Sequence, residues 1–272
     1  MSFLISHKKE FKITLEVVPP AGHDGKALLD KLNHLSGLPF DGFSVASNPV
    51  ARPRMSAMVF SHLLQQRTGK PAILHFTVRD HNRLGLQAEL WGAMALGIDT
   101  VIAVTGDPSA HDKKNPTTTV NDLNVCELIN MAEDTGLCTG AVLDYRPEVD
   151  GLETEVKRID KKAEAGCEFI VTQPVYDRET AEKIHAALSH IQVPVIMGIL
   201  PLISLKHAIF LHNKVAGIAV PEIIQQEMAR AEDPVAYGVS QSREMLALAK
   251  KIFSGACIMP PFDRFDILPE IL

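Results

Sequence analysis

The sequence lacks the features that mark membrane, secreted and nucleic-acid-binding proteins. It contains no run of about 18 apolar residues, so no transmembrane helix is predicted, and residues 1–12 hold no apolar core long enough for a signal peptide. Lys and Arg number 27 against 33 Asp and Glu, and the formal net charge is −6, whereas nucleic acid requires clustered basic residues. We therefore predict a cytoplasmic protein with neither a membrane nor a nucleic-acid partner.

Cysteine is sparse and scattered, and no Cys-x-x-Cys pair occurs. The four cysteines are Cys126, Cys138, Cys167 and Cys257. Disulfides are not expected in a reducing compartment, and the paired spacing of a zinc site is missing. His75, Asp80 and His81 are the one combination that could approach a metal, but the histidines show no His-Glu-x-x-His spacing. We predict no metal site.

Eight short segments rich in Val and Ile indicate buried strands, several of them apolar without alternation, as in parallel sheets. The predicted strands are Phe11–Val18, Gly42–Ala46, Ala72–Val78, Thr100–Thr105, Thr139–Leu143, Glu168–Gln173, Val193–Leu200 and Gly255–Met259. Helix-length segments separate them, so the sequence predicts an α/β fold, an eight-stranded (β/α) TIM barrel. An open doubly wound sheet is the alternative. No Gly-x-Gly-x-x-Gly motif follows the first strand, which weakens a dinucleotide-binding Rossmann fold.

The helical segments carry recognisable ends. Asp24 is the expected N-cap of the first helix, and Gly97 and Gly166 are expected to end two later ones. The predicted helices cover 25–35, 82–97, 152–166, 177–191, 218–233 and 234–251. The last two are the extra helices expected before the final strand, which leaves room for only a short terminal helix. Because no linker or repeat is present, we predict one catalytic domain spanning residues 1–272.

Polar residues recur where the predicted strands end, and in such a barrel the strand ends form the active site. Glu16 interrupts the first strand; buried and unpaired, it would be costly unless protonated. Asp107 follows the fourth strand, where a turn or helix-cap role is the alternative. His75 taken by itself fits a core histidine, and Gln173 an ordinary strand-end polar residue. Convergence of these ends at one mouth favours function for all of them.

The usual nucleophiles are missing. The sequence has no Gly-x-Ser-x-Gly elbow, no Walker loop and no evident Schiff-base lysine. The mouth thus offers an acid and polar donors but no nucleophile, which suits a cofactor that carries the reaction.

Four segments, in order and at matching spacing, resemble the methylenetetrahydrofolate reductase family. They are "TLEVVPP" (14–20), "LHFTVRDHNRLGLQAELWGAMALGIDTVIAVTGDP" (74–108), "KKAEAGCEFIVTQPVYD" (161–177) and "GILPLISLKHAIFLHNKVAGIAVPEII" (198–224). The resemblance covers nearly the whole chain. It implies an enzyme that uses FAD to pass a hydride to methylenetetrahydrofolate, giving methyltetrahydrofolate, or runs the reverse reaction.

The resemblance also implies roles for individual residues. Glu16 would be the general acid that protonates the folate nitrogen, and Asp107 would lie between flavin and folate as the second catalytic residue. Burial among Leu15, Val17 and Val18 would raise the pKa of Glu16. The implied substrate-binding residues are Gln173, His207 and Arg264. The implied flavin-binding residues are Ser47, His75, Thr77, Thr105, Gly106, Asp107, Tyr145, Glu155, Arg158, Lys161 and Lys162.

Departures from the family pattern leave the electron donor open. Tyr145 stands one place earlier than the family's tyrosine, Thr105 replaces an arginine, and His207 replaces a glutamine. The family has an aromatic residue that stacks on the nicotinamide cofactor, and Leu211 occupies that position here, with Phe210 beside it. NAD(P)H is therefore one expectation and an electron-transfer partner subunit the other, in a homo-oligomer or a hetero-complex.

Two alternatives to the flavin enzyme remain. One is a non-catalytic subunit that holds flavin or folate in a larger one-carbon or corrinoid complex, although binding alone would not need Glu16. The other is a flavin-free reductase on the same barrel.

Overall fold

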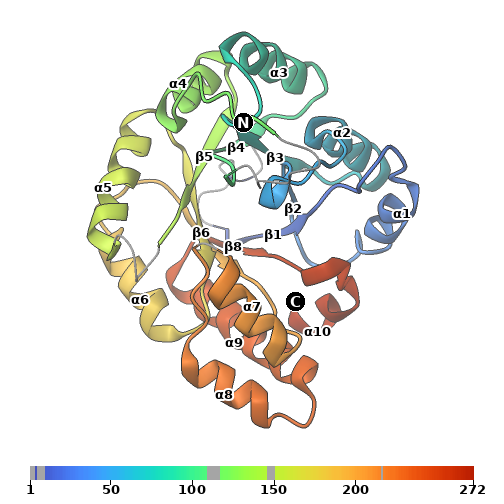
Figure 1. Cartoon of the computed structure of the whole chain (residues 1–272), viewed down its shortest axis with the longest axis vertical. Helices are drawn as coiled ribbons and strands as arrows, with labels where there is room; N and C mark the ends of the chain where they lie inside the picture. The colour runs from blue at the N-terminus through green and yellow to red at the C-terminus, as the bar shows by residue number, and fades with distance from the viewer. Residues whose placement is uncertain (1–3, 5–9, 109–116, 146–150, 216) are drawn as a thin grey trace.

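A computed structural model of the chain describes residues 4, 10–108, 117–145, 151–215 and 217–272. Eight parallel strands pair in chain order and close, since β1 pairs with both β2 and β8 (Figure 1). The strands are β1 (Lys12–Val17), β2 (Gly42–Val45), β3 (Ala72–Thr77), β4 (Thr100–Val104), β5 (Cys138–Leu143), β6 (Phe169–Pro174), β7 (Val195–Ile199) and β8 (Gly255–Ile258). The predicted TIM barrel is confirmed.

Ten helices surround the barrel in the described part of the chain (Figure 1). They are α1 (Lys26–His34), α2 (Ala57–Thr68), α3 (Arg83–Ala95), α4 (Val125–Thr135), α5 (Gly151–Glu164), α6 (Arg178–Ala187), α7 (Leu205–Lys214), α8 (Glu222–Arg230), α9 (Pro234–Ile252) and α10 (Leu268–Ile271). The short last helix agrees with the prediction. Three helices, not the expected two, lie between β7 and β8. The additional helix is α7, whose N-cap Ser204 accepts a hydrogen bond from the His207 N–H.

The first helix corrects the expected cap. Asp24 accepts a hydrogen bond from the Lys26 N–H at 3.0 Å, but Gly25 occupies the N-cap position and the helix begins at Lys26. The aspartate therefore satisfies a backbone donor of the first turn from one residue further out than expected.

The two faces of each strand enter different cores. Ile13, Leu15 and Val17 of β1 join the large cluster between the strands and the helices. The intervening side chains Thr14 and Glu16 consequently face the barrel lumen, because side chains alternate along a strand. A second cluster fills the lumen with Leu4, Ile73, Ile102, Cys138, Phe169, Val171, Ile196 and Cys257.

The lumen is packed at the end where the strands begin. Phe169, the first residue of β6, is fully buried and leaves no room at Gly140 of β5. A side chain there would start 2.3 Å from the Phe169 ring. Because the strands are parallel, Glu16 and the segments that follow β2, β3, β4 and β6 all lie toward the opposite end.

No helix in the described ranges has the length and apolar character needed to cross a membrane.

Candidate active site

Glu16 lies in the lumen near the end of β1, opposite Ser44 of β2 in the strand register. Burial raises its pKa from 4.5 to about 7. Burial is the expected cause, but the expected neighbours Leu15, Val17 and Val18 are not the ones that bury the carboxyl group. Leu15 and Val17 face the helices, not the lumen. The low dielectric comes from the lumen, where the carboxyl group interacts with the buried thiol of Cys257.

His75 of β3 shares this lumen. Its Nε2 and the hydroxyl of Ser44 form a hydrogen bond of 2.7 Å. Burial lowers the pKa of His75 from 6.5 to about 4, so its ring is neutral at physiological pH. The same burial that favours the protonated form of Glu16 favours the unprotonated form of His75, and these two side chains carry little charge between about pH 4 and pH 7.

An ion pair that the sequence analysis did not single out stands just beyond β3. Arg79, which is 3% exposed, donates from Nε to Asp80 Oδ1 at 2.6 Å and from Nη2 to Asp80 Oδ2 at 2.8 Å. Asp80 Oδ2 also accepts hydrogen bonds from the Thr77 hydroxyl and the Asn48 amide. These contacts hold the pKa of Asp80 below its usual range, despite burial that acts the other way.

This network includes two residues named in the sequence analysis. Thr77, expected to bind a cofactor, is 5% exposed and donates its hydroxyl to Asp80 at 3.0 Å. Asp80, the aspartate of the suggested metal trio, is held by Arg79. Among the described residues, no group of three His, Cys, Asp or Glu side chains could hold a metal ion.

The segment after β4 carries Thr105, Gly106 and Asp107. Thr105 and Asp107 are exposed, and Gly106 has φ 83°, a conformation that favours glycine. The carboxylate of Asp107 accepts a hydrogen bond from the Val50 N–H in the segment after β2. Ser47 is partly buried between β2 and that segment.

The expected flavin-binding cations lie on α5 around a buried carboxylate. Glu155, 1% exposed, accepts from the Asp144 N–H at 3.0 Å and pairs with Arg158 at 3.1 Å and Lys162 at 3.7 Å. Lys162 also donates to the Val142 carbonyl at 2.7 Å. Lys161 is exposed on the same helix. Glu155 therefore fixes α5 to the end of β5 and places two cations there.

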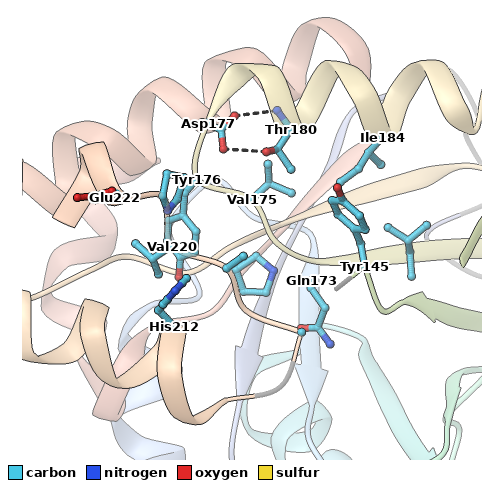
Figure 2. Close-up of a pocket in the computed structure, with 15 residues that line it drawn as sticks. Tyr145, Gln173, Val175, Tyr176, Asp177, Thr180, Ile184, His212, Val220 and Glu222 are labelled. Atoms are coloured by element: carbon cyan, nitrogen blue, oxygen red, sulfur yellow. Dashed lines mark hydrogen bonds between the residues drawn. The ribbon is translucent and has the colours of Figure 1, made fainter. Parts of the chain in front are cut away.

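Tyr145 and Gln173 line a pocket of about 180 Å³ between the ends of β5 and β6, helix α6 and the segment joining α7 to α8 (Figure 2). Asp177, on its rim, caps α6 through the Thr180 N–H at 2.7 Å. The hydroxyl of Tyr176 is buried with no hydrogen-bond partner in the described part of the chain. Figure 2 shows that hydroxyl directed toward His212. Tyr176 thus lines the same pocket as two predicted site residues, and its buried hydroxyl is a donor without a partner among the described residues.

The last two predicted substrate-binding residues follow β7 and β8. His207 is 7% exposed, its ring centroid lies 5.3 Å from that of Phe262, and its Nδ1 has no partner among the described residues. Arg264 holds Asp266 with two nitrogens, Nη2 at 2.7 Å and Nε at 2.8 Å. A ligand carboxylate at Arg264 would have to compete with Asp266.

Comparison with known families supplies the deciding observation. Residues 3–258 match the family model described as methylenetetrahydrofolate reductase. The chain belongs to this family. The match spans all eight strands, so the resemblance drawn from the sequence motifs is confirmed.

Relatives with this name are distant. A probable methylenetetrahydrofolate reductase (NADPH) of Caenorhabditis elegans is 25% identical over 243 residues, 83% of this chain and 35% of the relative. A 5,10-methylenetetrahydrofolate reductase of Pectobacterium carotovorum is 23% identical over 202 residues, 71% of this chain and 65% of the relative. The Escherichia coli reductase is 24% identical over 204 residues, covering 73% and 67%. The aligned part is thus about a third of the nematode relative and two thirds of the bacterial ones.

Solved structures support the fold. An uncharacterised protein from Clostridium thermocellum, described as binding two copies of 5-methyl-5,6,7,8-tetrahydrofolic acid, has a TM-score of 0.71 at 17% identity. The alignment covers 97% of this chain and 94% of that one. A 2,3-dimethylmalate lyase reaches 0.56 at 13% identity, covering 98% and 81%. At these identities the likeness concerns the barrel alone.

The family is generally flavin-dependent, and the chemistry of the residues present fits a flavin nucleotide. An uncharged imidazole, His75, and the exposed Thr105 lie toward one end of the barrel, and Arg158 and Lys162 stand beside the end of β5. Cationic side chains suit a diphosphate. The pocket beside Tyr145 adds an apolar wall from Leu143 and Ile184.

Sequence reasoning missed Ser44, Arg79 and Tyr176. The signal for Arg79 was the Arg-Asp pair directly after an apolar strand, because such a cation is buried only when it is paired. Ser44 lies inside the predicted strand Gly42–Ala46, where it was not singled out. Nothing in the sequence indicates the burial of the Tyr176 hydroxyl.

Proposed function

We propose that this chain catalyses the reduction of methylenetetrahydrofolate to methyltetrahydrofolate, or the reverse, with a hydride that FAD supplies when bound. One observation carries the proposal. The carboxyl group of Glu16 lies in the barrel lumen, and burial raises its pKa to about 7. A proton donor works best when its pKa is near the working pH.

Glu16 would donate its proton to the folate nitrogen that releases the methylene carbon. The five-membered ring opens, and the resulting iminium accepts the hydride. In the reverse direction the carboxylate takes the proton back. No cation pairs with Glu16 in the described part of the chain, so nothing there holds the carboxylate charged and the acid form persists to neutral pH.

The other predicted residues would bind and orient. Asp107 would accept hydrogen bonds from the pterin while its carboxylate stays tethered to Val50. Gln173 would bind the pterin from the pocket wall. Arg264 would bind the glutamate tail after exchanging Asp266 for the ligand carboxylate, since arginine matches carboxylate geometry with its forked donors.

The flavin would be held by His75, Thr105 and Tyr145 near the mouth and by Arg158, Lys161 and Lys162 at its diphosphate. Glu155 prearranges Arg158 and Lys162, because its buried carboxylate fixes both cations before a ligand arrives.

The electron donor is proposed in two forms, NAD(P)H or a partner subunit. Leu211, at the stacking position, is 5% exposed and packs into the cluster of α7 and α8, whereas Phe210 is 52% exposed. Stacking on Leu211 would need α7 to shift, and an exposed Phe210 suits a ligand or a protein surface equally.

Purified protein tests the proposal directly. We expect a flavin absorption spectrum, bleached by methyltetrahydrofolate under anaerobic conditions, and dye-linked oxidation of methyltetrahydrofolate. Bleaching by NADH would identify the donor. A yellow protein without folate turnover would favour the non-catalytic subunit, and a colourless protein that reduces the folate with NADH would favour the flavin-free reductase.

A further inference from the structure

Arg79 is anchored before it reaches toward the mouth. Two of its nitrogens are fixed on Asp80, and Asp80 is fixed in turn by Thr77 of β3 and Asn48 of the segment after β2. With its side chain 4% exposed, the guanidinium has no room to turn. Its remaining donors therefore point in set directions.

Those remaining donors reach two other segments of the mouth. Nη1 donates to the Asp107 carbonyl at 3.1 Å, and Nη2 donates to the Asn48 carbonyl at 3.3 Å. The Asp107 carboxylate in turn accepts from the Val50 N–H. A closed ring of contacts results, in which the segments after β2, β3 and β4 are joined through one side chain.

The backbone before Asp107 is shaped to admit this side chain. Gly106 has φ 83°, and a Cβ there would lie 3.1 Å from Arg79 Cβ and 3.3 Å from Arg79 Nη1. The glycine thus meets two requirements at once, the left-handed conformation and the close approach of the guanidinium. Arg79 and Gly106 together fix the path of the chain into Asp107.

We propose that Arg79 is a positioning residue that orients the Asp107 carboxylate at the mouth, which rests on the role of Asp107 in the proposed function. The requirement is for the planar fork and not only for positive charge. Lysine could pair with Asp80, but its single nitrogen could not also reach the carbonyls of Asp107 and Asn48. Loss of these contacts lets the segment after β4 move and misplaces the carboxylate.

Kinetics of Arg79→Lys and Asp107→Asn, singly and combined, test this coupling. We expect Arg79→Lys to lower kcat for methyltetrahydrofolate oxidation by roughly 10-fold or more, the size typical of losing charge-assisted hydrogen bonds. In the Asp107→Asn background the same change should cost less than about 2-fold, because no carboxylate is left to place. Arg67→Lys, at an exposed ion pair with Asp30, is the matched control and should leave kcat unchanged.

A second readout does not depend on folate chemistry. Hydrogen exchange should accelerate at the amides of Val50, Arg52 and Arg54 in Arg79→Lys and not in Arg67→Lys, because these N–H groups donate to the Asp107 carboxylate, the Pro49 carbonyl and the Asn48 side chain. Unchanged exchange at the Val50 amide, which the Asp107 carboxylate holds, would overturn the positioning role, even if the wild-type chain had no folate activity. Additive losses in the double variant would overturn it while leaving the proposed function intact. A wild type without turnover would instead defeat the proposed function, and the exchange result would still decide the role of Arg79.

Discussion

Apart from the Glu155 network at the end of β5, the two halves of the barrel mouth are built differently. From β1 to β4, polar side chains bind one another and the backbone: Ser44 holds His75, and Arg79 holds Asp80 and two neighbouring segments. From β5 to β8, the mouth contains a pocket, a buried Tyr176 hydroxyl without a partner among the described residues, and an exposed Phe262.

This difference separates two tasks. A network whose members satisfy one another is rigid and suits groups that must stay in place during chemistry. A wall with unused hydrogen-bonding capacity and exposed apolar surface suits a ligand that comes and goes. We infer that the first half is assigned to the reaction and the second half to recognition.

Removing the acid should have the largest effect. Glu16→Gln should lower folate turnover by roughly 10²–10⁴-fold, the usual contribution of a general acid, while anaerobic flavin reduction by the electron donor stays near the wild-type rate. Glu10→Gln, on an exposed carboxylate that pairs with Lys12, is the control and should leave both rates unchanged. Equal loss of the two half-reactions would contradict a role confined to the folate.

Breaking the network of the first half should cost stability. Asp80→Ala leaves the buried Arg79 guanidinium unpaired, and removing one partner of a buried ion pair costs about 3–5 kcal/mol. Asp30→Ala removes an exposed partner of Arg67 and should cost less than about 1 kcal/mol. Urea denaturation of both variants measures the contrast. Equal losses would mean that the Arg79–Asp80 pair contributes no more to stability than an exposed ion pair.

Glu16 should also make stability depend on pH. Its folded pKa of about 7 exceeds the ordinary value of 4.5, so the folded state holds the proton more tightly and stability falls as the pH rises from 4.5 through 7. At pH 8 the free energy of unfolding of Glu16→Gln, measured by urea denaturation, should therefore exceed that of wild type by up to about 3 kcal/mol. At pH 4 the two should match. A difference independent of pH would refute the raised pKa.

The smallest effect concerns the second half. Tyr176→Phe removes a buried hydroxyl that has no partner among the described residues, and should leave the free energy of unfolding unchanged or raise it by less than about 1 kcal/mol. Tyr237→Phe removes a hydroxyl that donates to Glu227 at 2.7 Å and should lower it by about 1 kcal/mol. Thermal unfolding at one pH compares the pair. A clear loss from Tyr176→Phe would mean that its hydroxyl is satisfied in solution.

Local patterns predicted the strands well, and the helices less evenly. All eight strands begin and end within two residues of expectation, because runs of Val and Ile bounded by turn residues are a strong signal. Helices α2 and α4 were both missed. The apolar residues of α2 do not form one face, since Val59 and Leu63 are exposed while Ser61 is buried, and no apolar stripe marks such a helix. Helix α4 has both signals, a capping box formed by Asn124 and Glu127 and a buried apolar face, and they were overlooked.

The candidate site was predictable only where one residue carried its own signal. A carboxylate in an apolar strand indicated a raised pKa, yet the neighbours that raise it come from other strands. In a strand that is apolar on both faces, the sequence does not reveal which residues face the lumen and which face the helices. The contacts of Arg79 join segments about 30 residues apart in either direction, and only the closed barrel brings them together.

The packed end of the barrel lumen has a consequence for how protons would reach Glu16. In the described part of the chain, Phe169 and the side chains packed with it close the end of the lumen where the strands begin, so Glu16 would reach bulk water through the mouth that a ligand would also use. While a ligand fills the mouth, Glu16 would have no contact with bulk water from which to take up a proton. Reprotonation of Glu16 would thus follow release of the product, which lets water return to the mouth.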